Sequence, residues 1–520
     1  MAQGALGFQY ELETTDSGLT ALGGLPLYLD LARVAGLADS IDEHVGARRH
    51  GQGWTDAQMV LAGILLQLSG GDCVDDLERL QSDGGFALLM RQLEWKHLPR
   101  WERRDLERRF RKGRERAVPS PSAMRRYLQV FHDPETEEKR LAFEKETGRK
   151  AFIPAPNECL RGLRRVNRDL LAFLQVKSPE PQATLDLDAS LVASYKQAAR
   201  FSYKGGKAFQ PLQVWWAEQQ VMVLSEFRDG NVPAGHENLR VLQESLDELP
   251  PGVDAVRLRS DTAGYQWEIL HFCERGQSKR FGRIEFAVGC DVSPEFKAAV
   301  ALIPESDWYP IYRYTEEGER SETGRQWAEV DYAPAGLWTG AVKTTTYRFL
   351  ATREPMEERV LPEMPQPVLP FPIMDLGAKS YKVHGIVTNL RAADGWEDGE
   401  DIVAFLYQRC GKSEEAHSVL KEDLGGGKLP SQDFGANAAW WWMSVLALNL
   451  NSMLKRVVLG GDWSTRRLKA LRFHLIHIAG RVVERARQLI LRLASGAGEI
   501  LETILQARTK MLGWATSPPG

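Results

Sequence analysis

The segment TLDLDAS, residues 184–190, sets the expectation for the fold of the whole chain. Apolar and acidic residues alternate along it with the period of a β-strand, so Asp186 and Asp188 point to the same face of a sheet. Aspartate is uncommon inside strands, and two buried like charges are costly unless a cation neutralises them. The pair therefore indicates either a cation site or the exposed polar face of an edge strand.

Short β-rich runs continue after this segment and alternate with helical patterns. Strands are predicted at residues 184–190, 211–217, 221–227, 256–260 and 284–288, and helices at residues 237–249 and 264–275. A strand reached through a helix generally pairs in parallel through a right-handed crossover. The order β-β-β-α-β-α-β thus predicts an α/β fold with a mixed sheet and helices on its faces.

The chain before this sheet reads as helical. Residues 1–175 carry apolar residues three and four apart, with a capping box at Thr55 and Gln58. Ser120 followed by Pro121 supplies a further N-cap and a first-turn proline. We expect a helical N-terminal region that takes part in DNA binding.

A basic run supports that expectation. The formal net charge of −4 argues against a uniformly cationic surface, yet residues 100–126 carry eleven Lys and Arg against four Asp and Glu. Arg125 and Arg126 end the run on a predicted helix. The run indicates either phosphate contacts or a solvated helix face crossed by salt bridges.

The chain after the sheet changes character twice. Residues 291–395 contain proline clusters and strand patterns at residues 338–343, 347–351 and 383–388, which predicts a β-rich insertion. Helical patterns return at residues 413–423, 437–455 and 463–512. We therefore expect a catalytic core from residues 180–290 and 396–460, and a helical C-terminal region, residues 461–520, for DNA binding or dimerisation.

Two further carboxylates stand at informative positions. Asp261 directly follows the predicted strand 256–260, at the carboxyl end where open sheets build their sites, although an aspartate there also suits a helix N-cap. Tyr407, Glu414 and Lys421 follow one another at intervals of seven residues, about two helical turns. A helix continuous past Gly411 would carry them on one face, as would a charged surface helix of no special role.

Taken together, the carboxylates indicate metal-dependent phosphodiester cleavage more strongly than any one of them does alone. Cleavage of a phosphodiester by two divalent ions about 4 Å apart requires several convergent carboxylates. Magnesium prefers oxygen ligands and keeps positions open for phosphate. We predict that Asp188, Asp261 and Glu414 hold Mg²⁺, with Mn²⁺ as a substitute, and that Asp186 is the alternative first ligand.

With these residues in place, the chain resembles the DDE transposases of bacterial insertion sequences, in the class with a Y-x2-R-x3-E-x6-K signature. Tyr407, Glu414 and Lys421 match the tyrosine, glutamate and lysine of that signature. Asp188 and Asp261 resemble the first and second aspartates of the family. The resemblance covers roughly residues 20–460 and implies a ribonuclease-H-like sheet with a β-rich insertion.

The resemblance also implies an activity. The enzyme would bind the inverted-repeat ends of its element as a homodimer, nick to release a 3′-hydroxyl, pass through a hairpin intermediate and join the ends to target DNA. Tyr407, Arg409 and Lys421 would contact DNA, and an insertion tryptophan would stack on a flipped base. The candidates for that role are Trp308, Trp327 and Trp338.

The chain departs from the signature at one position. Cys410 stands where the family has arginine, and Arg409 is displaced by one residue. A shift of one residue on a helix turns a side chain by about 100°, so Arg409 does not simply replace the missing phosphate contact. A catalytically impaired DNA-binding descendant is therefore the first alternative, and a metal-dependent phosphoesterase for small phosphates is the second.

The expected compartment is the bacterial cytoplasm. Five cysteines lie far apart without CxxC spacing, which fits reduced intracellular thiols. The first residues lack the basic and apolar regions of a secretory signal, and the most apolar run, residues 440–454, is too short to span a bilayer. We expect a nucleoid-associated protein with double-stranded DNA, and no membrane, as its partner.

Overall fold

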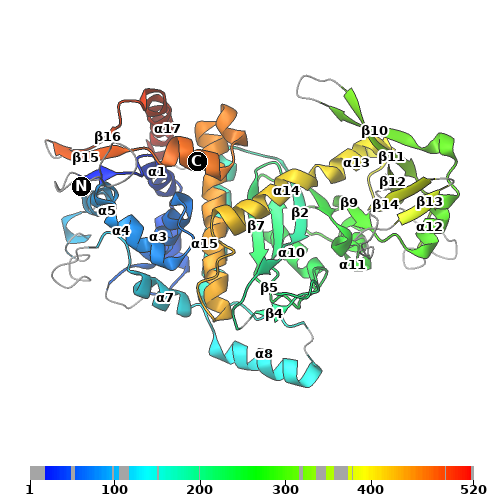
Figure 1. Ribbon diagram of the computed structural model, residues 1–520, viewed down its shortest axis with the longest axis horizontal. Helices are drawn as coiled ribbons and strands as arrows, with labels where there is room; N and C mark the ends of the chain where they lie inside the picture. Colours follow the sequence, from blue (N-terminus) through cyan, green and yellow to red (C-terminus); the bar gives the residue numbers. More distant parts are fainter. Residues whose placement is uncertain are drawn as a thin grey trace, which may run out of the picture. The chain divides into compact units, whose positions relative to one another are not determined.

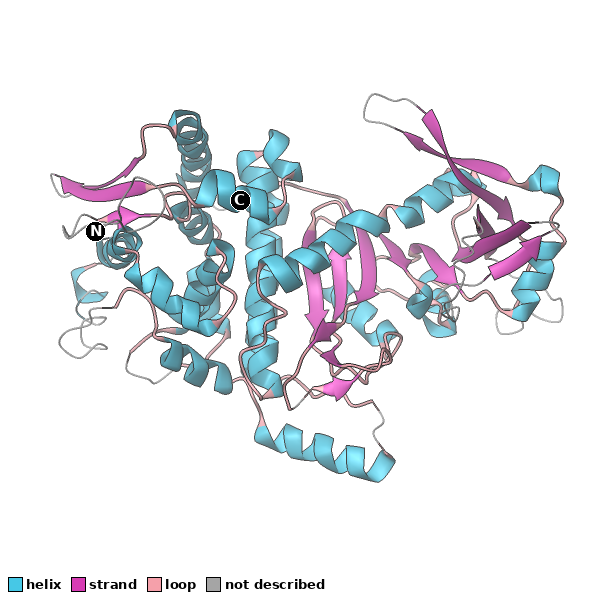
Figure 2. Ribbon diagram, in the orientation of Figure 1, coloured by secondary structure: helices cyan, strands magenta, loops and turns pink. Residues whose placement is uncertain are grey.

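The chain folds into two compact units. The computed structural model describes residues 18–48, 53–96, 99–102, 104, 116–148, 151–197, 199–314, 320–334, 347–356, 373–376, 379–485 and 488–516. Unit 1 comprises Met1–Asp133, Pro156–Asp169 and Val419–Gly520, and unit 2 comprises Pro134–Ala155 and Leu170–Ser418 (Figure 1). Helices predominate in unit 1, and unit 2 contains the large sheet (Figure 2).

Unit 2 is built on a mixed sheet whose centre has the predicted topology. Its core strands are β2 (Gln182–Ala189), β6 (Leu212–Trp216), β7 (Val221–Glu226), β8 (Ala255–Ser260) and β9 (Glu285–Cys290). They lie in the order β9-β8-β2-β6-β7. The strands β2, β6 and β7 pair antiparallel, whereas β8 and β9 join in parallel. This is a ribonuclease-H-like sheet, so the predicted fold class is confirmed.

The β-rich insertion extends this same sheet rather than forming a separate one. Its strands are β10 (Tyr309–Tyr314), β11 (Arg320–Glu329), β12 (Arg348–Pro355), β13 (Ile373–Leu376) and β14 (Lys379–Thr388). They pair antiparallel, and β14 pairs with β9, which makes one ten-stranded sheet. The predicted strands at residues 347–351 and 383–388 are confirmed, and the one at residues 338–343 lies outside the described residues.

Helices surround the sheet of unit 2. They are α8 (Pro134–Thr147), the end of α9 (Glu158–Lys177), α10 (Asn238–Glu248), α11 (Trp267–Glu274), α12 (Pro294–Ala301), α13 (Gly399–Tyr407) and α14 (Arg409–Ser418). Apolar residues of α13, among them Ile402 and Leu406, pack in one buried cluster with Ala287 of β9 and Leu350 of β12. This packing fixes α13 against the sheet next to the strands that carry the predicted site.

Unit 1 is mainly helical, as its sequence pattern predicts. Its helices are α1 (Pro26–Val34), α2 (Leu37–His44), α3 (Asp56–Ser69), α4 (Leu77–Ser82), α5 (Gly84–Lys96), α7 (Pro121–Gln129), the start of α9, α15 (Phe434–Met453), α16 (Leu468–Leu471) and α17 (Gly498–Thr516). The capping box at Thr55 and the Ser120 N-cap are both present. Residues 419–460 thus group with the N-terminal helices, although we expected residues 396–460 in the core.

The helix α15 forms the centre of unit 1. It is buried along its whole length and packs against α3 and α7. Two of its three asparagines lie near its carboxyl end, and each has a buried partner: Asn451 accepts a hydrogen bond from Tyr28 at 2.8 Å, and Asn449 donates one to Asn167 at 2.7 Å. Because their side-chain amides are hydrogen-bonded, these asparagines cost little folding free energy when they are buried in the core.

The prediction of a wholly helical C-terminal region is wrong for residues 480–493. These residues form β15 (Gly480–Arg485) and β16 (Gln488–Leu493), which join β1 (Leu19–Thr20) in a small antiparallel sheet. The paired valines and the Leu-Ile-Leu run suit strands by their β-branched and apolar side chains. Short apolar runs do not distinguish helix from strand by period alone, and here the two runs pair with each other as a hairpin that β1 extends.

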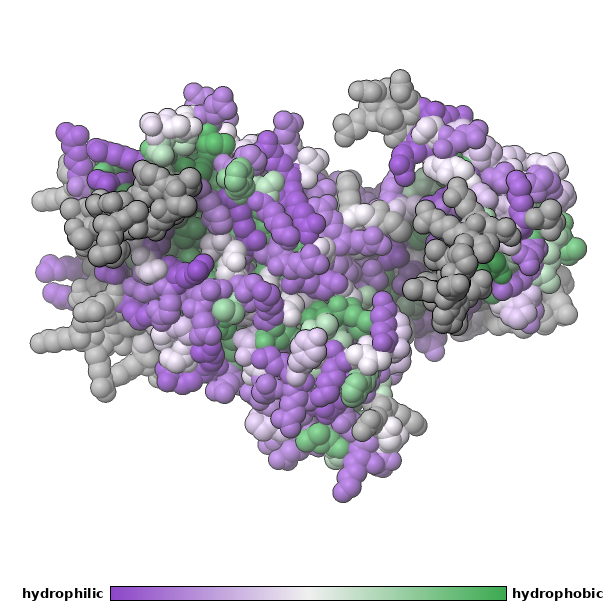
Figure 3. Space-filling model, in the orientation of Figure 1, coloured by the Kyte–Doolittle hydropathy of each residue, from purple (hydrophilic) through white to green (hydrophobic). Residues whose placement is uncertain are grey.

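Two global features complete the description. Among the described residues no single helix combines the length and apolar composition needed to cross a bilayer, although the bent pair Asp56–Ser69 and Val74–Ser82 does so jointly. On the face drawn in Figure 3, hydrophilic residues cover most of the described surface, with small hydrophobic areas between them.

Candidate active site

Asp188 and Asp261 lie at the carboxyl ends of neighbouring parallel strands. The strands β2 and β8 stay in register up to the pair Leu187 and Ser260, and each aspartate is the next residue along its strand. The Ser260 hydroxyl donates to the Leu187 carbonyl at 3.0 Å and ties the two strand ends together. The sheet therefore brings together Asp188 and Asp261, two carboxylates whose residue numbers differ by 73.

Asp186 does not share this role. Two residues back on β2, its carboxylate accepts hydrogen bonds from Nε and Nη2 of Arg259 at 2.6 and 2.9 Å. Arg259 also donates to the Phe405 carbonyl of α13 at 2.9 Å, and both charged side chains are buried. A carboxylate neutralised by a two-pronged arginine pair has little capacity left for a cation. The structure thus argues against Asp186 as the alternative first ligand.

Glu414 enters the site from α14. It is exposed, and its charge raises the pKa of Asp188. Burial is the largest cause that raises the pKa of the Asp188 carboxyl, with the positive charge of Arg409 opposing it. Burial also raises the pKa of Asp261, and the charge of Asp188 adds to that effect. Asp188 therefore feels the negative charge of Glu414, and Asp261 feels that of Asp188, which is a condition that a cation relieves.

Arg409 is the cation that this structure places among them. Its Nη1 lies 3.1 Å from Oδ2 of Asp188, and the two side chains are only 14% and 17% exposed. Its charge lowers the pKa of Asp261 and of Asp186 as well as that of Asp188. The arginine displaced by one residue from the family signature thus faces the first aspartate.

The helix that carries the signature is broken. The helix α13 ends at Tyr407, α14 begins at Arg409, and Gly411 has φ +111°, a conformation that favours glycine. The helical prediction for residues 413–423 is also only partly right, since Val419–Asp423 is a π-helical segment. One continuous helical face does not form, because the glycine turns the backbone inside the signature.

Tyr407 and Lys421 lie in different surroundings. The Tyr407 hydroxyl shares a hydrogen bond of 2.7 Å with Oγ1 of Thr352 on β12. Lys421 belongs to the π-helical segment of unit 1, where its carbonyl accepts from the Gly427 backbone N–H at 3.0 Å. The side chain of Cys410 lies outside the described residues. Of the residues that the signature supplies, unit 2 brings Arg409 and Glu414 to the two aspartates.

Gln213 of β6 is a residue at the site that the sequence did not single out. It is the register partner of Asp188, and partners across an antiparallel pair share one face of a sheet. The side chain is fully buried, and neither amide atom has a hydrogen-bond partner among the residues that the structure describes. A polar residue inside the apolar run Leu212–Trp216 was the available signal, and its place opposite Asp188 comes from the register.

The N-terminal arginines lie elsewhere, in unit 1. Arg125 and Arg126 are exposed on α7, and Arg125 forms an ion pair with Asp75. Arg116 pairs with Glu78 at 3.0 Å, but most of the basic run lies outside the described residues. The described part of the run thus shows salt-bridged arginines on a solvated surface.

A second acidic group occurs in unit 1. The possible ligand atoms of Asp72, Cys73 and Asp76 lie within 4.8 Å of one another, a closer spacing than that of Asp188, Asp261 and Glu414. The Asp76 carboxylate accepts from the backbone N–H of Asp72 and of Cys73, and Asp72 pairs with Lys428. These bonds cap a turn, which explains the group without a metal.

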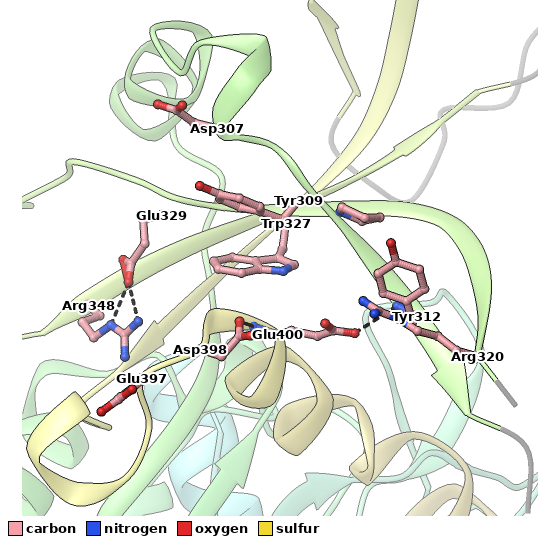
Figure 4. Close-up of a pocket in the computed structure, with 11 residues that line it drawn as sticks. Asp307, Tyr309, Tyr312, Arg320, Trp327, Glu329, Arg348, Glu397, Asp398 and Glu400 are labelled. Carbon is pink, nitrogen blue, oxygen red and sulfur yellow. Dashed lines mark hydrogen bonds and ion pairs between the residues drawn. The ribbon is translucent and has the colours of Figure 1, made fainter. Parts of the chain in front are cut away.

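The insertion tryptophans are packed. Trp308 lies under the guanidinium of Arg353, 4.2 Å from the ring centroid, and Trp327 is covered by the Tyr309 ring at 5.1 Å and by Gly399, where a Cβ would clash with the indole. Trp327 lines a pocket of about 800 Å³ in which Tyr309 is the more exposed ring (Figure 4). Trp338 lies outside the described residues.

A comparison with known protein families identifies the family of this chain. A family model described as transposase DDE domain group 1 matches residues 7–510. The chain belongs to this family.

Other comparisons add a structural likeness. No curated protein matches the chain. Among solved structures, the chain is similar to a piggyBac transposase in a synaptic complex with hairpin DNA, with 10% identity, a TM-score of 0.42, and coverage of 86% of this chain and 79% of that one. The family membership rests on the family model.

Proposed function

We propose that the chain is a DNA transposase of the bacterial insertion-sequence type, which cleaves and joins DNA at the inverted-repeat ends of its element. The observation that carries the proposal is the placement of Asp188 and Asp261 at adjacent parallel strand ends, with Glu414 close enough to raise the pKa of Asp188. Membership of the transposase family supports the same chemistry.

The donor set fits a magnesium ion. All three side chains offer hard carboxylate oxygens, the ligands that Mg²⁺ prefers, and Mn²⁺ accepts the same set. The repulsion of Asp188 by Glu414 and of Asp261 by Asp188, and the guanidinium of Arg409 against Asp188, support a preference for positive charge at this end of the sheet. When bound, magnesium would neutralise developing charge at a phosphate and lower the pKa of a water molecule.

The chain's own residues perform the remaining tasks. Asp188, Asp261 and Glu414 hold the cation, and Arg259 keeps the charge of Asp186 neutralised beneath them. Arg409 contacts a DNA phosphate after it leaves Asp188, and its planar guanidinium suits a two-pronged phosphate bond. Tyr407 exchanges its hydrogen bond with Thr352 for a phosphate contact near the cleaved end.

The proposed partners follow from the same reaction. Lys421, Arg125 and Arg126 contact the backbone of double-stranded DNA, both terminal repeats and target. Two copies of the chain pair the two element ends in a synaptic complex, and cleavage passes through a hairpin. The protein acts in the bacterial cytoplasm at the nucleoid.

Strand transfer on a labelled terminal repeat tests the proposal. Purified protein with Mg²⁺ or Mn²⁺ is expected to cut and join the repeat, and EDTA stops both steps. Asp261→Asn is expected to lower cleavage at least about a hundredfold, because a metal ligand supports several kcal/mol of transition-state stabilisation. Glu415→Gln, a change to the exposed neighbour of Glu414, serves as the matched control and leaves cleavage intact. Full activity of the Asp261→Asn protein removes Asp261 from the site.

One specific observation favours a second candidate, a descendant that binds element ends without cutting them. The arginine position of the signature holds Cys410, and Arg409 pairs with Asp188. In that case the wild-type protein shifts the labelled repeat in a gel but cuts nothing with either metal. Cleavage by the wild-type protein excludes this candidate.

A further inference from the structure

The segment that follows the Asp188 strand folds into a small second sheet. Its strands β3 (Val192–Ala193), β5 (Lys207–Phe209) and β4 (Arg200–Phe201) lie in the order β3-β5-β4 and pair antiparallel. The first of them begins three residues beyond the end of β2, which carries Asp188. In the sequence, this small sheet therefore follows directly after the strand that carries Asp188.

Aromatic rings project from this sheet into solvent. Tyr195 is fully exposed at 103% of its reference area, Tyr203 is 76% exposed, and Phe201 is 59% exposed. Large rings exposed together over ten residues of chain are unusual on a surface without a partner. All three rings are therefore largely open to solvent.

The same segment is purely cationic. Residues 190–217 contain Lys196, Arg200, Lys204 and Lys207 and no carboxylate. The ammonium groups of Lys204 and Lys207 lie over the rings of Tyr203 and Phe201, at 5.7 and 6.0 Å from the ring centroids. Phe201 and Lys207 are register partners and share a face of the sheet, and Tyr195, Tyr203 and Lys204 lie in the loops that join its strands. Exposed rings and positive charges therefore occur together in this segment, a combination that complements bases and phosphates.

The sheet is held rigidly within unit 2. Arg200 forms a two-pronged ion pair with Glu144 of α8, at 2.6 and 2.9 Å, and α8 lies beside the sheet in Figure 1. Phe209 stacks on Phe227 with 4.9 Å between the centroids. The turn from Ser202 to Gly206 closes with a backbone hydrogen bond of 2.8 Å. A fixed platform of rings binds a base with little loss of conformational entropy.

We propose that the exposed rings and lysines of this sheet and its loops, Tyr195, Phe201, Tyr203, Lys204 and Lys207, bind unpaired nucleotides of a DNA strand next to the cleavage site. The rings stack on bases, and the two lysines contact the flanking phosphates. Paired DNA offers its phosphates but not the faces of its bases, so the rings select a single strand. This inference rests on the proposed function only for its statement that the strand leads to the active site.

Binding of a labelled twelve-nucleotide thymidine strand, compared with a duplex that lacks the element ends, tests the proposal by fluorescence anisotropy. The triple change Tyr195→Ser, Phe201→Ser and Tyr203→Ser is expected to weaken single-strand binding at least about tenfold, as stacking on one ring already accounts for about that much. Duplex binding is expected to change less than twofold. Single-strand binding equal to wild type in the triple variant overturns the proposal.

Two control variants separate stacking from folding. Tyr195→Phe, Phe201→Tyr and Tyr203→Phe together keep the rings and are expected to bind the strand as wild type does; weak binding by this set overturns the stacking argument. Phe473→Ser removes an exposed ring of unit 1 and is expected to change nothing. The pair Lys204→Gln and Lys207→Gln is expected to lower the slope of log affinity against log salt by about 1.4. An unchanged slope removes the lysines from the phosphate contacts.

The outcomes are distinguishable from failure of the proposed function. If the protein cuts its terminal repeat but wild type and triple variant bind the thymidine strand equally weakly, this surface has no nucleic-acid role and the transposase proposal stands. If the strand binds through these rings but no repeat is cut, only the proposed catalysis fails. A triple variant that loses dimer mass in light scattering while keeping strand binding makes the surface a contact between copies of the chain and overturns the inference.

Discussion

Nη1 of Arg409 lies 3.1 Å from Oδ2 of Asp188, so the first predicted metal ligand is paired with a cation of its own chain. Arg409 is the first residue of α14, directly after the break between α13 and α14 at Gln408. A guanidinium and a divalent ion compete for the same carboxylate. Entry of a metal therefore requires that Arg409 move, and the freed side chain becomes available to a phosphate.

Arg409→Gln is expected to bind Mn²⁺ more tightly than wild type. A partly buried ion pair contributes on the order of 1 kcal/mol, so its removal is worth about fivefold in metal affinity. Isothermal titration calorimetry with Mn²⁺ measures the effect, and Arg409→Lys, which keeps the charge, serves as the control. A weaker or unchanged affinity in Arg409→Gln would falsify competition between the two cations.

Cys410→Arg is expected to raise affinity for the element end. The change restores arginine at the signature position while Arg409 continues to face Asp188, so a second guanidinium becomes available for a phosphate. A charge-assisted contact adds about 1.5 kcal/mol or more, roughly tenfold in affinity. Gel shifts with the terminal repeat measure it, with Cys410→Ser as the neutral control. Equal binding by both variants removes the phosphate explanation of this position.

Tyr407→Phe separates a packing role from a DNA contact. Its hydroxyl shares a hydrogen bond with Thr352, so Tyr407→Phe and Thr352→Val each lose about 1 kcal/mol of unfolding free energy. If the hydroxyl also contacts a phosphate, Tyr407→Phe alone weakens end binding, by about fivefold. Urea titration and gel shifts give the two readouts. A parallel loss of end binding in Thr352→Val assigns the effect to packing.

The buried pair of Asp186 and Arg259 is expected to be structural. Removing one partner leaves a buried charge without its counter-ion, so Arg259→Met lowers the free energy of unfolding by about 3–5 kcal/mol. The double change Asp186→Leu with Arg259→Met removes both charges and recovers most of that loss. Denaturant titration compares the two proteins. A double variant no more stable than the single one contradicts this assignment.

Asp229 predicts a pH dependence of stability. Burial raises the pKa of its carboxyl to about 6, although Arg140 donates to it at 2.9 Å and opposes the shift. Because the pKa of Asp229 is higher in the folded protein, this carboxyl contributes its full stabilisation below its pKa in the unfolded chain, near 4. That contribution is lost as the pH rises through about 6. Two pKa units correspond to about 3 kcal/mol.

Urea titrations from pH 4 to pH 7 check this prediction. The unfolding free energy of wild type is expected to fall relative to that of Asp229→Asn across that window and to run parallel above pH 7. Glu135→Gln, a change at an exposed position of α8, controls for general surface charge. Parallel curves for wild type and Asp229→Asn throughout the window refute the shift.

The strands of the core could be predicted because their local patterns agree with their tertiary roles. Alternation in residues 184–190 and the runs that follow it predicted β2, β6, β7, β8 and β9 within a few residues. The same local evidence failed at β15 and β16, where short apolar runs suit either helix or strand and the two runs pair with each other and with β1. It also did not show that the insertion continues the core sheet, since the pairing of β14 with β9 joins residues about 100 positions apart.

The sequence by itself determined the fold class, because strand periodicity and strand ends are local properties of the chain, and it supplied Asp188, Asp261 and Glu414 as the predicted ligands. The tertiary structure decided which of the acidic residues stand together and what neutralises them. Register places Arg259 beside Asp186 and Gln213 opposite Asp188, and the start of α14 places Arg409 against Asp188. These relationships depend on contacts between distant segments, and electrostatic energy depends on distance in space and burial, which no local pattern contains.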